Sequence, residues 1–384
     1  MTTVIVSGAL ANKCGNGGNA WTRMQWVLGL RSLGFDVFFV EQIGRNACVD
    51  SNGLPVEFDN SRNVAYFREV CECFGLADRA ALVCEEGSRV FGLSIASMQE
   101  VARGSEILIN IGGHLTLDEI KCLPRCRVFF DDDPAHTQFW HADGLGHGRL
   151  AGHEHYFTVG LNIGSAECCV PTNGISLRPL FPLVALDAWP DCTPGPFGKF
   201  TTVASWRGAY GPIERDGQVF GQKAHEFRKF VELPRQSTGS FELALDIHPA
   251  DHRDLADLRE NGWHIVPAHD VASDPQSYQH YVQASGNEFS AAQQIYVRSQ
   301  CGWFSDRTAC YLASGRPALV QDTGFSGALP VGHGLVPFRT MSEAAAGAAR
   351  IMGDYERHCR EARALAEQWF DARKVLTSVL QQIG

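Results

Sequence analysis

The segment from Ser305 to Thr308 gathers side chains that suit the binding of phosphate. Ser305 is a typical N-cap residue, and an apolar helical pattern follows it. The start of a helix offers unpaired N–H groups and a partial positive charge, and both favour an anion. Asp306 follows the cap, Arg307 adds a guanidinium that can hold phosphate through two bonds, and Thr308 adds a hydroxyl. The segment therefore predicts a phosphate site, although a capped helix with a solvated arginine would show the same residues.

The residues that come next have a spacing typical of one class of enzyme. Residues 315–317 read G-R-P, the apolar run 318–321 follows, and Asp322, Thr323 and Gly324 close the segment. This order resembles the donor-binding half of GT-B nucleotide-sugar glycosyltransferases. The resemblance implies that Asp322, Thr323 and Gly324 meet the hydroxyls of the donor sugar.

The same resemblance extends to neighbouring residues. Thr308 lies seven residues before Gly315, which is the offset of the phosphate-binding Ser or Thr in one related group. The stretch Gly302–Arg307 reads G-W-F-S-D-R, and it resembles uncharacterised bacterial glycosyltransferases. Cys310 stands where the family has a ribose-binding glutamate, so Glu288 is the candidate replacement. The paired glutamates of retaining members are absent, which leaves the stereochemical class open.

Two basic residues earlier in the second half are candidates for the diphosphate. Arg207 follows an apolar segment at 200–205, and Lys223 begins a predicted helix. The resemblance implies that such residues neutralise the charge on the departing nucleotide. Either residue alone would be equally compatible with a solvated surface cation.

A glycine-rich segment follows the first predicted strand. Gly17 and Gly18 lie within residues 15–19, where we expect a loop that lets the backbone approach a ligand closely. In GT-B enzymes this loop lies under the donor phosphates. Glu41 lies at the end of the second predicted strand, where a dinucleotide-binding oxidoreductase has an acidic residue. This half of the chain therefore does not exclude that class of enzyme.

Candidate catalytic groups follow two further predicted strands. His114 comes after a pair of glycines, and Asp133 closes a run of three carboxylates before Pro134. Sugar transfer to a hydroxyl needs a base near the acceptor, and α/β sheets bind ligands at the carboxyl ends of their strands. We therefore expect Asp133 or His114 to be catalytic, with His136 as a further option.

A group of four histidines and one glutamate contains side chains that can bind a metal ion. Its members are His141, His147, His153, Glu154 and His155. Their spacing does not match the i, i+4 pattern of helical zinc ligands, so we expect a surface loop and no metal. No cofactor is expected either, because a nucleoside-diphosphate sugar acts as a co-substrate.

The elements that must position these residues alternate between apolar strands and helical segments. Residues 3–7, a helical pattern and residues 36–41 form a strand–helix–strand unit, and the second half repeats this order. The fold class is therefore α/β, with two Rossmann-like lobes facing across a cleft. We expect an acceptor domain at 1–188, a donor domain at 189–360 and a C-terminal helix at 361–384 that packs back on the first domain.

Composition narrows the choice of partners. The chain has 384 residues and a net charge of −10, and most of this charge lies in residues 1–190. Such a balance disfavours nucleic acid and anionic membranes as partners. The thirteen cysteines show no C-x-x-C pair, which favours reduced thiols. The chain contains neither a run of 18 apolar residues nor a secretory signal. We expect a cytoplasmic protein, and no pattern indicates an oligomeric state.

Together these observations predict a glycosyltransferase. It would move a sugar from a nucleoside-diphosphate sugar, with UDP or TDP as the nucleotide, to a hydroxyl or amine of a small acceptor such as a natural product. A nucleotide-sugar epimerase of the same fold and a non-catalytic two-lobed binding protein remain the alternatives.

Overall fold

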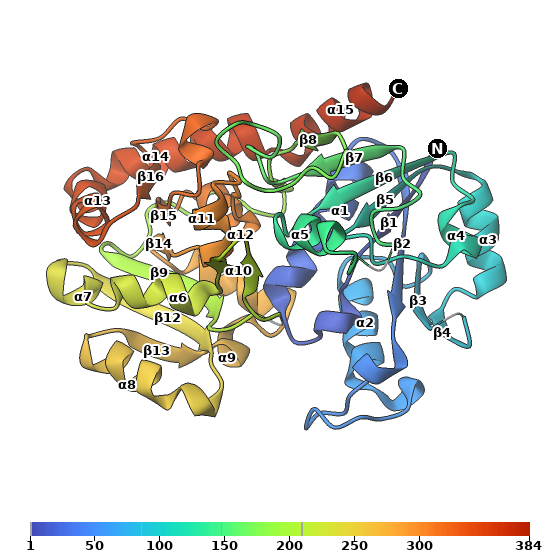
Figure 1. Cartoon of the computed structure of the whole chain (residues 1–384), viewed down its shortest axis with the longest axis horizontal. Helices are drawn as coiled ribbons and strands as arrows, with labels where there is room; N and C mark the ends of the chain where they lie inside the picture. The colour runs from blue at the N-terminus through green and yellow to red at the C-terminus, as the bar shows by residue number, and fades with distance from the viewer. Residues whose placement is uncertain (1, 86, 147, 209) are drawn as a thin grey trace.

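The computed structural model describes residues 2–85, 87–146, 148–208 and 210–384. The chain forms two α/β lobes, each built on its own sheet (Figure 1). Most of the strands that form the middle of each sheet are buried, and their sequences are mostly apolar, as expected where helices cover both faces. The structure thus confirms the predicted architecture of two α/β lobes.

The first lobe contains an eight-stranded sheet with the order β4-β3-β2-β1-β5-β6-β7-β8. All neighbouring strands run parallel except β3 and β4, which are antiparallel. The strands are β1 Thr3–Ser7, β2 Asp36–Ile43, β3 Ala80–Cys84, β4 Arg89–Gly92, β5 Ser105–Ile111, β6 Cys126–Asp131, β7 His155–Thr158 and β8 Leu177–Pro179. Its helices are α1 Gly17–Ser32, α2 Arg62–Cys73, α3 Ile95–Arg103, α4 Asp118–Lys121 and α5 His136–Ala142.

The second lobe contains a six-stranded parallel sheet with the order β13-β12-β9-β14-β15-β16. The strands are β9 Lys199–Ser205, β12 Ser240–Asp246, β13 His264–Pro267, β14 Asn287–Ser290, β15 Ala318–Gln321 and β16 Leu335–Phe338. Its helices are α6 Lys223–Phe227, α7 Leu233–Gln236, α8 His252–Glu260, α9 Ala268–Ala272, α10 Pro275–Gln283, α11 Gln294–Ser299, α12 Asp306–Ala313, α13 Met341–Gly353 and α14 Tyr355–Leu365.

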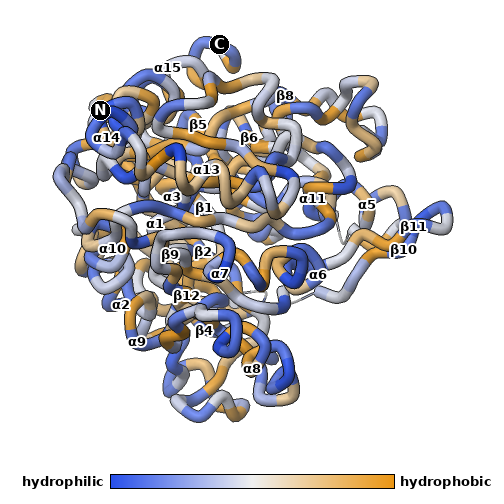
Figure 2. Tube along the Cα trace, turned by 90° about the vertical axis from the view of Figure 1, so that its left-hand side faces the viewer, coloured by the Kyte–Doolittle hydropathy of each residue, from blue (hydrophilic) through white to orange (hydrophobic). Residues whose placement is uncertain are grey.

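A small hairpin lies outside both sheets. Its strands are β10 Ile213–Arg215 and β11 Gln218–Phe220. Figure 2 shows it projecting from the body of the molecule with a hydrophilic tip. The ring of Phe220 packs on Phe139 of α5, with 5.0 Å between ring centroids, so the hairpin of the second lobe contacts the first.

The end of the chain returns to the first lobe (Figure 1). Helix α15, Ala372–Ile383, packs against α1, and its buried Leu376 and Val379 belong to the core of the first lobe. A Cβ atom at Gly29 of α1 would lie 2.6 Å from Cδ1 of Leu376, so only glycine allows this approach. The last helix thereby ties the two lobes together.

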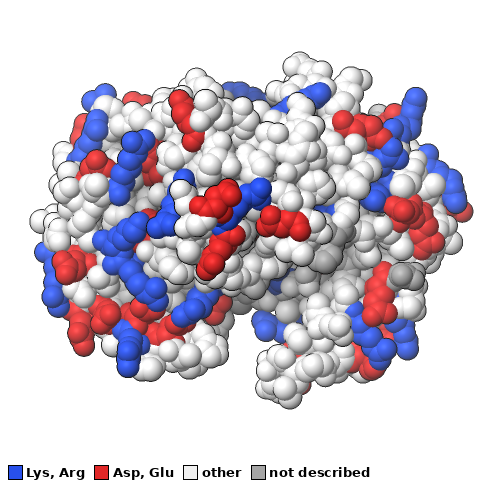
Figure 3. Space-filling view, viewed as in Figure 1, with Lys and Arg blue, Asp and Glu red and all other residues white. Residues whose placement is uncertain are grey.

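The surface carries charge of both signs. Figure 3 shows acidic and basic side chains interspersed over both lobes, with a hollow between the lobes at the lower edge. No helix in the described part of the chain is both long and apolar enough to cross a membrane. All thirteen cysteines lie in the described residues and are free thiols.

Candidate functional site

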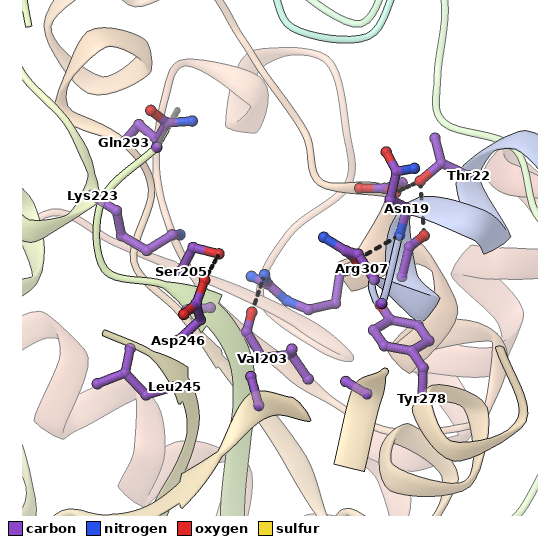
Figure 4. Close-up of a pocket in the computed structure, with 18 of the residues that line it drawn as sticks. Asn19, Thr22, Val203, Ser205, Lys223, Leu245, Asp246, Tyr278, Gln293 and Arg307 are labelled. Carbon is purple, nitrogen blue, oxygen red and sulfur yellow. Dashed lines mark hydrogen bonds between the residues drawn. The ribbon is translucent and has the colours of Figure 1, made fainter. Parts of the chain in front are cut away.

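A cleft of about 780 Å³ lies between the two lobes. The first lobe lines it with the start of α1, with Arg62, with Phe130 at the end of β6 and with Asp132 directly after that strand. The second lobe lines it with the carboxyl ends of β9 and β12, the start of α6 and the start of α12. These are the ends of parallel strands at which α/β sheets bind ligands. Figure 4 shows the side chains that face this space.

Arg307 is held rigidly at the wall of the cleft. Its Nε donates to Oε1 of Glu288 at 2.7 Å, and its two Nη atoms donate to the carbonyl oxygen of Val203 and to Oγ of Ser290, each at 2.8 Å. Only 13% of the side chain is exposed. Its position on the first turn of α12 places a fixed cation beside the positive end of a helix, as an anion site requires.

Glu288 lies behind Arg307 and does not line the cleft. Its side chain is fully buried on β14, and Oε1 accepts the bond from Arg307. Within the described residues, Oε2 has no hydrogen-bond partner. In this arrangement the carboxylate positions the guanidinium, and the contact of Glu288 with a nucleotide ribose stays a prediction.

Lys223 supplies a second cation to the same space. Its Nζ donates to the carbonyl oxygen of Ala291 at 2.6 Å. Figure 4 shows the side chains of Lys223 and Arg307 extending toward each other on the second-lobe wall of the cleft. Burial and, to a smaller extent, the nearby charge of Arg307 lower the pKa of Lys223 to about 7, although the charge of Glu288 opposes the shift. The two cations are thus placed for a ligand that carries at least two negative charges.

The other residues around the start of α12 divide between the cleft and the core. Asp306 lines the cleft, and its carboxylate accepts a bond from Thr22 of α1 across the lobe boundary. Ser305 precedes the helix, but its side chain makes no capping bond. Thr308 is fully buried and does not line the cleft, and its hydroxyl has no partner among the described residues.

The segment after β15 forms a closed turn. The carboxylate of Asp322 accepts bonds from the N–H of Gly324 at 2.9 Å and from Oγ of Ser326 at 2.7 Å, and Arg339 pairs with it at 2.8 Å. Thr323 donates to the carbonyl oxygen of Trp303 at 2.6 Å. None of the predicted residues Asp322, Thr323 and Gly324 lines the cleft.

Arg207 also lies outside the lining of the cleft. Its guanidinium makes two bonds to the buried carboxylate of Asp251 in the second lobe. More than half of the Arg207 side chain is exposed. Of the two basic residues predicted for the diphosphate, Lys223 alone faces the cleft.

The two predicted loop glycines belong to a helix. Asn16 caps α1, and Gly17 and Gly18 form its first turn. A Cβ atom at Gly17 would lie 2.0 Å from the carbonyl oxygen of Asp274, and one at Gly18 would lie 2.9 Å from the ring of Tyr278. These glycines allow α1 to approach α10 of the other lobe, and Gly18 also lines the cleft.

Glu41 has a structural role in the first lobe. Its buried carboxylate accepts the N–H groups of Ala11 at 2.6 Å and Asn12 at 2.8 Å. Burial raises the pKa of Glu41 to about 7, although these backbone bonds oppose the shift. The residue is unavailable to a ribose hydroxyl, which removes the sequence feature that favoured an oxidoreductase.

The three carboxylates after β6 have three different environments. Asp131 is buried and accepts bonds from Gln138 and Thr158, and burial raises its pKa to about 7. Asp132 lines the cleft and pairs with Arg23 at 2.7 Å. Asp133, which the sequence singled out, does not line the cleft. Because the three residues are identical and adjacent, the sequence gives no signal that distinguishes Asp132 from the other two.

The carboxylate of Asp133 is fixed by two neighbours. Its Oδ1 accepts a bond from the hydroxyl of Tyr296, on α11 of the second lobe, and lies 3.0 Å from Nδ1 of His136. Burial raises the pKa of Asp133, but the charge of His136 and these bonds outweigh it and hold the pKa below its usual range. Asp133 therefore joins the two lobes.

His114 lies beside Asp132 but does not line the cleft. Burial lowers its pKa to about 3, and the charges of Arg149 and Arg23 add to this effect. The ring is therefore neutral near pH 7, and it can exchange hydrogen bonds but cannot act as an acid there.

No metal site is found in the described part of the chain, where no three His, Cys, Asp or Glu side chains gather around one point. His147, a member of the histidine group noted in the sequence, lies outside the described residues. His153 of the same group contacts Nδ2 of Asn110 through Nε2, so this ring is engaged within the first lobe.

No family model matches this chain, and no curated protein matches its sequence. Solved structures match its whole length at low identity. An alpha-glucosyltransferase in complex with UDP has 11% identity and a TM-score of 0.58, and the match covers 100% of this chain and 99% of that chain. HepE of Anabaena, in complex with UDP and glucose, has 10% identity, a TM-score of 0.58 and the same coverage. Sucrose-phosphate synthase of Thermosynechococcus elongatus has 11% identity, a TM-score of 0.57 and coverage of 100% and 98%.

These matches define the fold. The chain has the two-lobed GT-B architecture that these glycosyltransferases share, over its full length. The alpha-glucosyltransferase was also solved with UDP and a 13-mer DNA, with a TM-score of 0.59 at 11% identity.

Proposed function

We propose that this chain is a glycosyltransferase that moves a sugar from a UDP-sugar to a hydroxyl or amine of a small acceptor. The observation that carries the proposal is the convergence of Lys223, Arg307 and the start of α12 on one wall of the cleft. The GT-B fold and the UDP bound in similar structures support this choice. TDP remains the second nucleotide to examine.

The chemistry needs these two cations because the departing nucleoside diphosphate gains negative charge as the bond to the sugar breaks. Arg307 and Lys223 are largely removed from water, and a fixed cation acts more strongly there than at the surface. Because Glu288 and Ser290 already hold Arg307 in place, little reorganisation is needed during the reaction.

Apolar side chains of the second lobe suit the nucleoside. Leu245, Ile247, Leu255, Ile265 and Pro267 line the cleft, and they come from the carboxyl ends of β12 and β13 and from α8. Apolar side chains in a cleft with two cations match a flat base joined to a diphosphate. The acceptor then occupies the side of the cleft that the first lobe forms.

We infer a small acceptor in preference to nucleic acid. The chain carries a net charge of −10, and it lacks the excess of basic residues that phosphate-backbone binding requires. The 13-mer DNA in the structure of the similar alpha-glucosyltransferase is a finding about that protein alone.

A thermal-shift screen with UDP, TDP and GDP tests the donor assignment. A nucleotide present at a hundredfold excess over its Kd stabilises the folded chain by about 2.7 kcal/mol. We expect a clear rise in Tm with UDP, loss of most of this rise in Lys223→Met, and retention in Arg253→Gln, which changes an exposed cation that does not line the cleft. The absence of a shift with every nucleotide would overturn the proposal.

An assay with a UDP-sugar alone separates transfer from epimerisation. A glycosyltransferase releases UDP as it transfers the sugar to water, and it leaves the remaining donor unchanged. Chromatography measures the donor after the reaction. Conversion of the donor into a second UDP-sugar would instead identify an epimerase of the same fold.

A further inference from the structure

We propose that Asp132 is the carboxylate that takes the proton from the acceptor, and that Arg23 is its positioning residue. The proposal rests on the function proposed above and names the residue that acts on the acceptor side. It also assigns Asp133 to the contact between the lobes.

The geometry of Asp132 separates it from its neighbours. It lines the cleft, and 19% of its side chain is exposed. Nη2 of Arg23 donates to Oδ2 at 2.7 Å. Oδ1 makes no hydrogen bond to any described residue, so it is available to an acceptor hydroxyl.

Arg23 fixes the orientation of this carboxylate. It comes from α1, and only 4% of its side chain is exposed. A guanidinium removed from water needs a partner, and Asp132 is the carboxylate that pairs with it. The ion pair holds one oxygen of Asp132 and turns the other away from Arg23.

The backbone beside Asp132 keeps the space around Oδ1 open. Gly112 and Gly113, directly after β5, have φ angles of 65° and 64°, in the left-handed region. A Cβ atom at Gly112 would lie 3.2 Å from Oδ1 of Asp132 and 2.9 Å from the ring of His114. Any side chain at Gly112 would crowd the oxygen that the proposal assigns to the acceptor.

Asp133 differs from Asp132 in its place, not in its exposure, since 42% of its side chain is exposed. Its Oδ1 is occupied by Tyr296 and His136, and it lies outside the lining of the cleft. The bond to Tyr296 spans the two lobes, which is a positioning role.

The reaction step balances with these groups alone. The acceptor oxygen bonds to the anomeric carbon of the donor sugar as its proton passes to Oδ1 of Asp132. The bond between that carbon and the oxygen of the β-phosphate breaks, and the nucleoside diphosphate leaves with the electron pair. Lys223 and Arg307 stabilise the charge that the leaving group gains.

Hydrolysis provides a test that needs no knowledge of the acceptor, because water can take its place. UDP release is measured from a panel of UDP-sugars, beginning with UDP-glucose, for wild type, Asp132→Asn and Asp133→Asn. We expect Asp132→Asn to lower kcat by about 100-fold or more while the Kd for UDP stays within about twofold. Asp133→Asn removes the same charge from the next residue, and we expect less than about a tenfold loss.

Arg23→Lys tests the positioning role. It keeps the positive charge and loses the planar fork, so we expect kcat to fall while the Kd for UDP is unchanged and the acidic limb of the pH–rate profile moves. Circular dichroism and Tm verify that each variant is folded.

Three results would overturn the inference. The first is full UDP release by Asp132→Asn, and the second is a larger loss in Asp133→Asn. The third is a wild-type chain that binds UDP but hydrolyses no UDP-sugar, since Asp132 would then activate no nucleophile. Failure of the wild type to bind UDP would instead overturn the proposed function, so the two failures are distinguishable.

Discussion

The two cations of the cleft are held in different ways. Arg307 makes three bonds to fixed partners, and one of them is a buried carboxylate that keeps it charged. Lys223 makes one bond to a neutral carbonyl oxygen, and the carboxylate of Glu288 beside it is already engaged by Arg307. The charge of Lys223 therefore depends on what occupies the cleft, whereas that of Arg307 does not.

This difference predicts that donor affinity depends on pH. In the free protein, burial and the charge of Arg307 lower the pKa of Lys223 to about 7, whereas a bound diphosphate favours the charged amine and raises this pKa. Binding therefore takes up a proton above pH 7. We expect the affinity for UDP-glucose to be constant below pH 7 and to weaken above it, by at most about tenfold per pH unit.

Calorimetric titration between pH 6 and 9 measures this dependence. UDP-glucose is the suitable ligand because, unlike UDP, it has no terminal phosphate that titrates near pH 6. Lys223→Arg keeps its charge throughout and should bind with an affinity that does not change with pH. A flat profile in the wild type would contradict the prediction.

Helix α1 shows where local sequence patterns stop being informative. Residues 15–19 suggest a loop because glycine is unfavourable in helices and frequent in turns. Gly17 and Gly18 instead begin a helix, since Asp274 and Tyr278 of the other lobe leave no room for a side chain. That constraint comes from residues more than 250 positions away.

The site shows the same division between local and distant information. The alternation of strands and helices along the chain, and the places of Lys223 and Arg307 at helix starts, follow from apolar patterns and capping residues, which are local. The choice of Asp132 among three aspartates depends on Arg23, and the closure of the turn at Asp322 depends on Arg339. Neither pairing can be read from the segment that contains it.

The contact between α1 and α10 can be tested at a single position. In Gly17→Ala the new methyl group would lie 2.0 Å from the carbonyl oxygen of Asp274, so the lobes must shift apart. We expect a destabilisation of about 1–3 kcal/mol and weaker binding of UDP, because α1 also lines the cleft.

Tm and UDP titration measure these two effects. Gly44→Ala is the matched control, because Gly44 has a φ of −76° and nothing lies within 4 Å of its Cβ position. Equal behaviour of the two variants would show that the close approach of α1 to α10 does not constrain the lobes.

At the scale of the whole molecule, the chain crosses between the lobes twice at one place. The N–H of Val184 donates to Phe370 at 2.7 Å, and the N–H of Ala372 donates to Val184 at 2.9 Å. The first crossing runs from β8 to β9, and the second leads from α14 into α15. The two segments brace each other, and α15 then joins the core of the first lobe.

This arrangement makes the first lobe depend on the last residues of the chain. Leu376 is 1% exposed and packs on Gly29 of α1, the helix that carries Arg23 and lines the cleft. We expect Leu376→Ala to cost about 2–5 kcal/mol in the free energy of unfolding, because it removes a buried side chain and leaves a cavity. Urea unfolding followed by tryptophan fluorescence measures the loss, with the exposed Ser378→Ala as the control. The variant should also bind UDP more weakly, since α1 loses its support, and unchanged stability with unchanged binding would show that α15 only covers the first lobe.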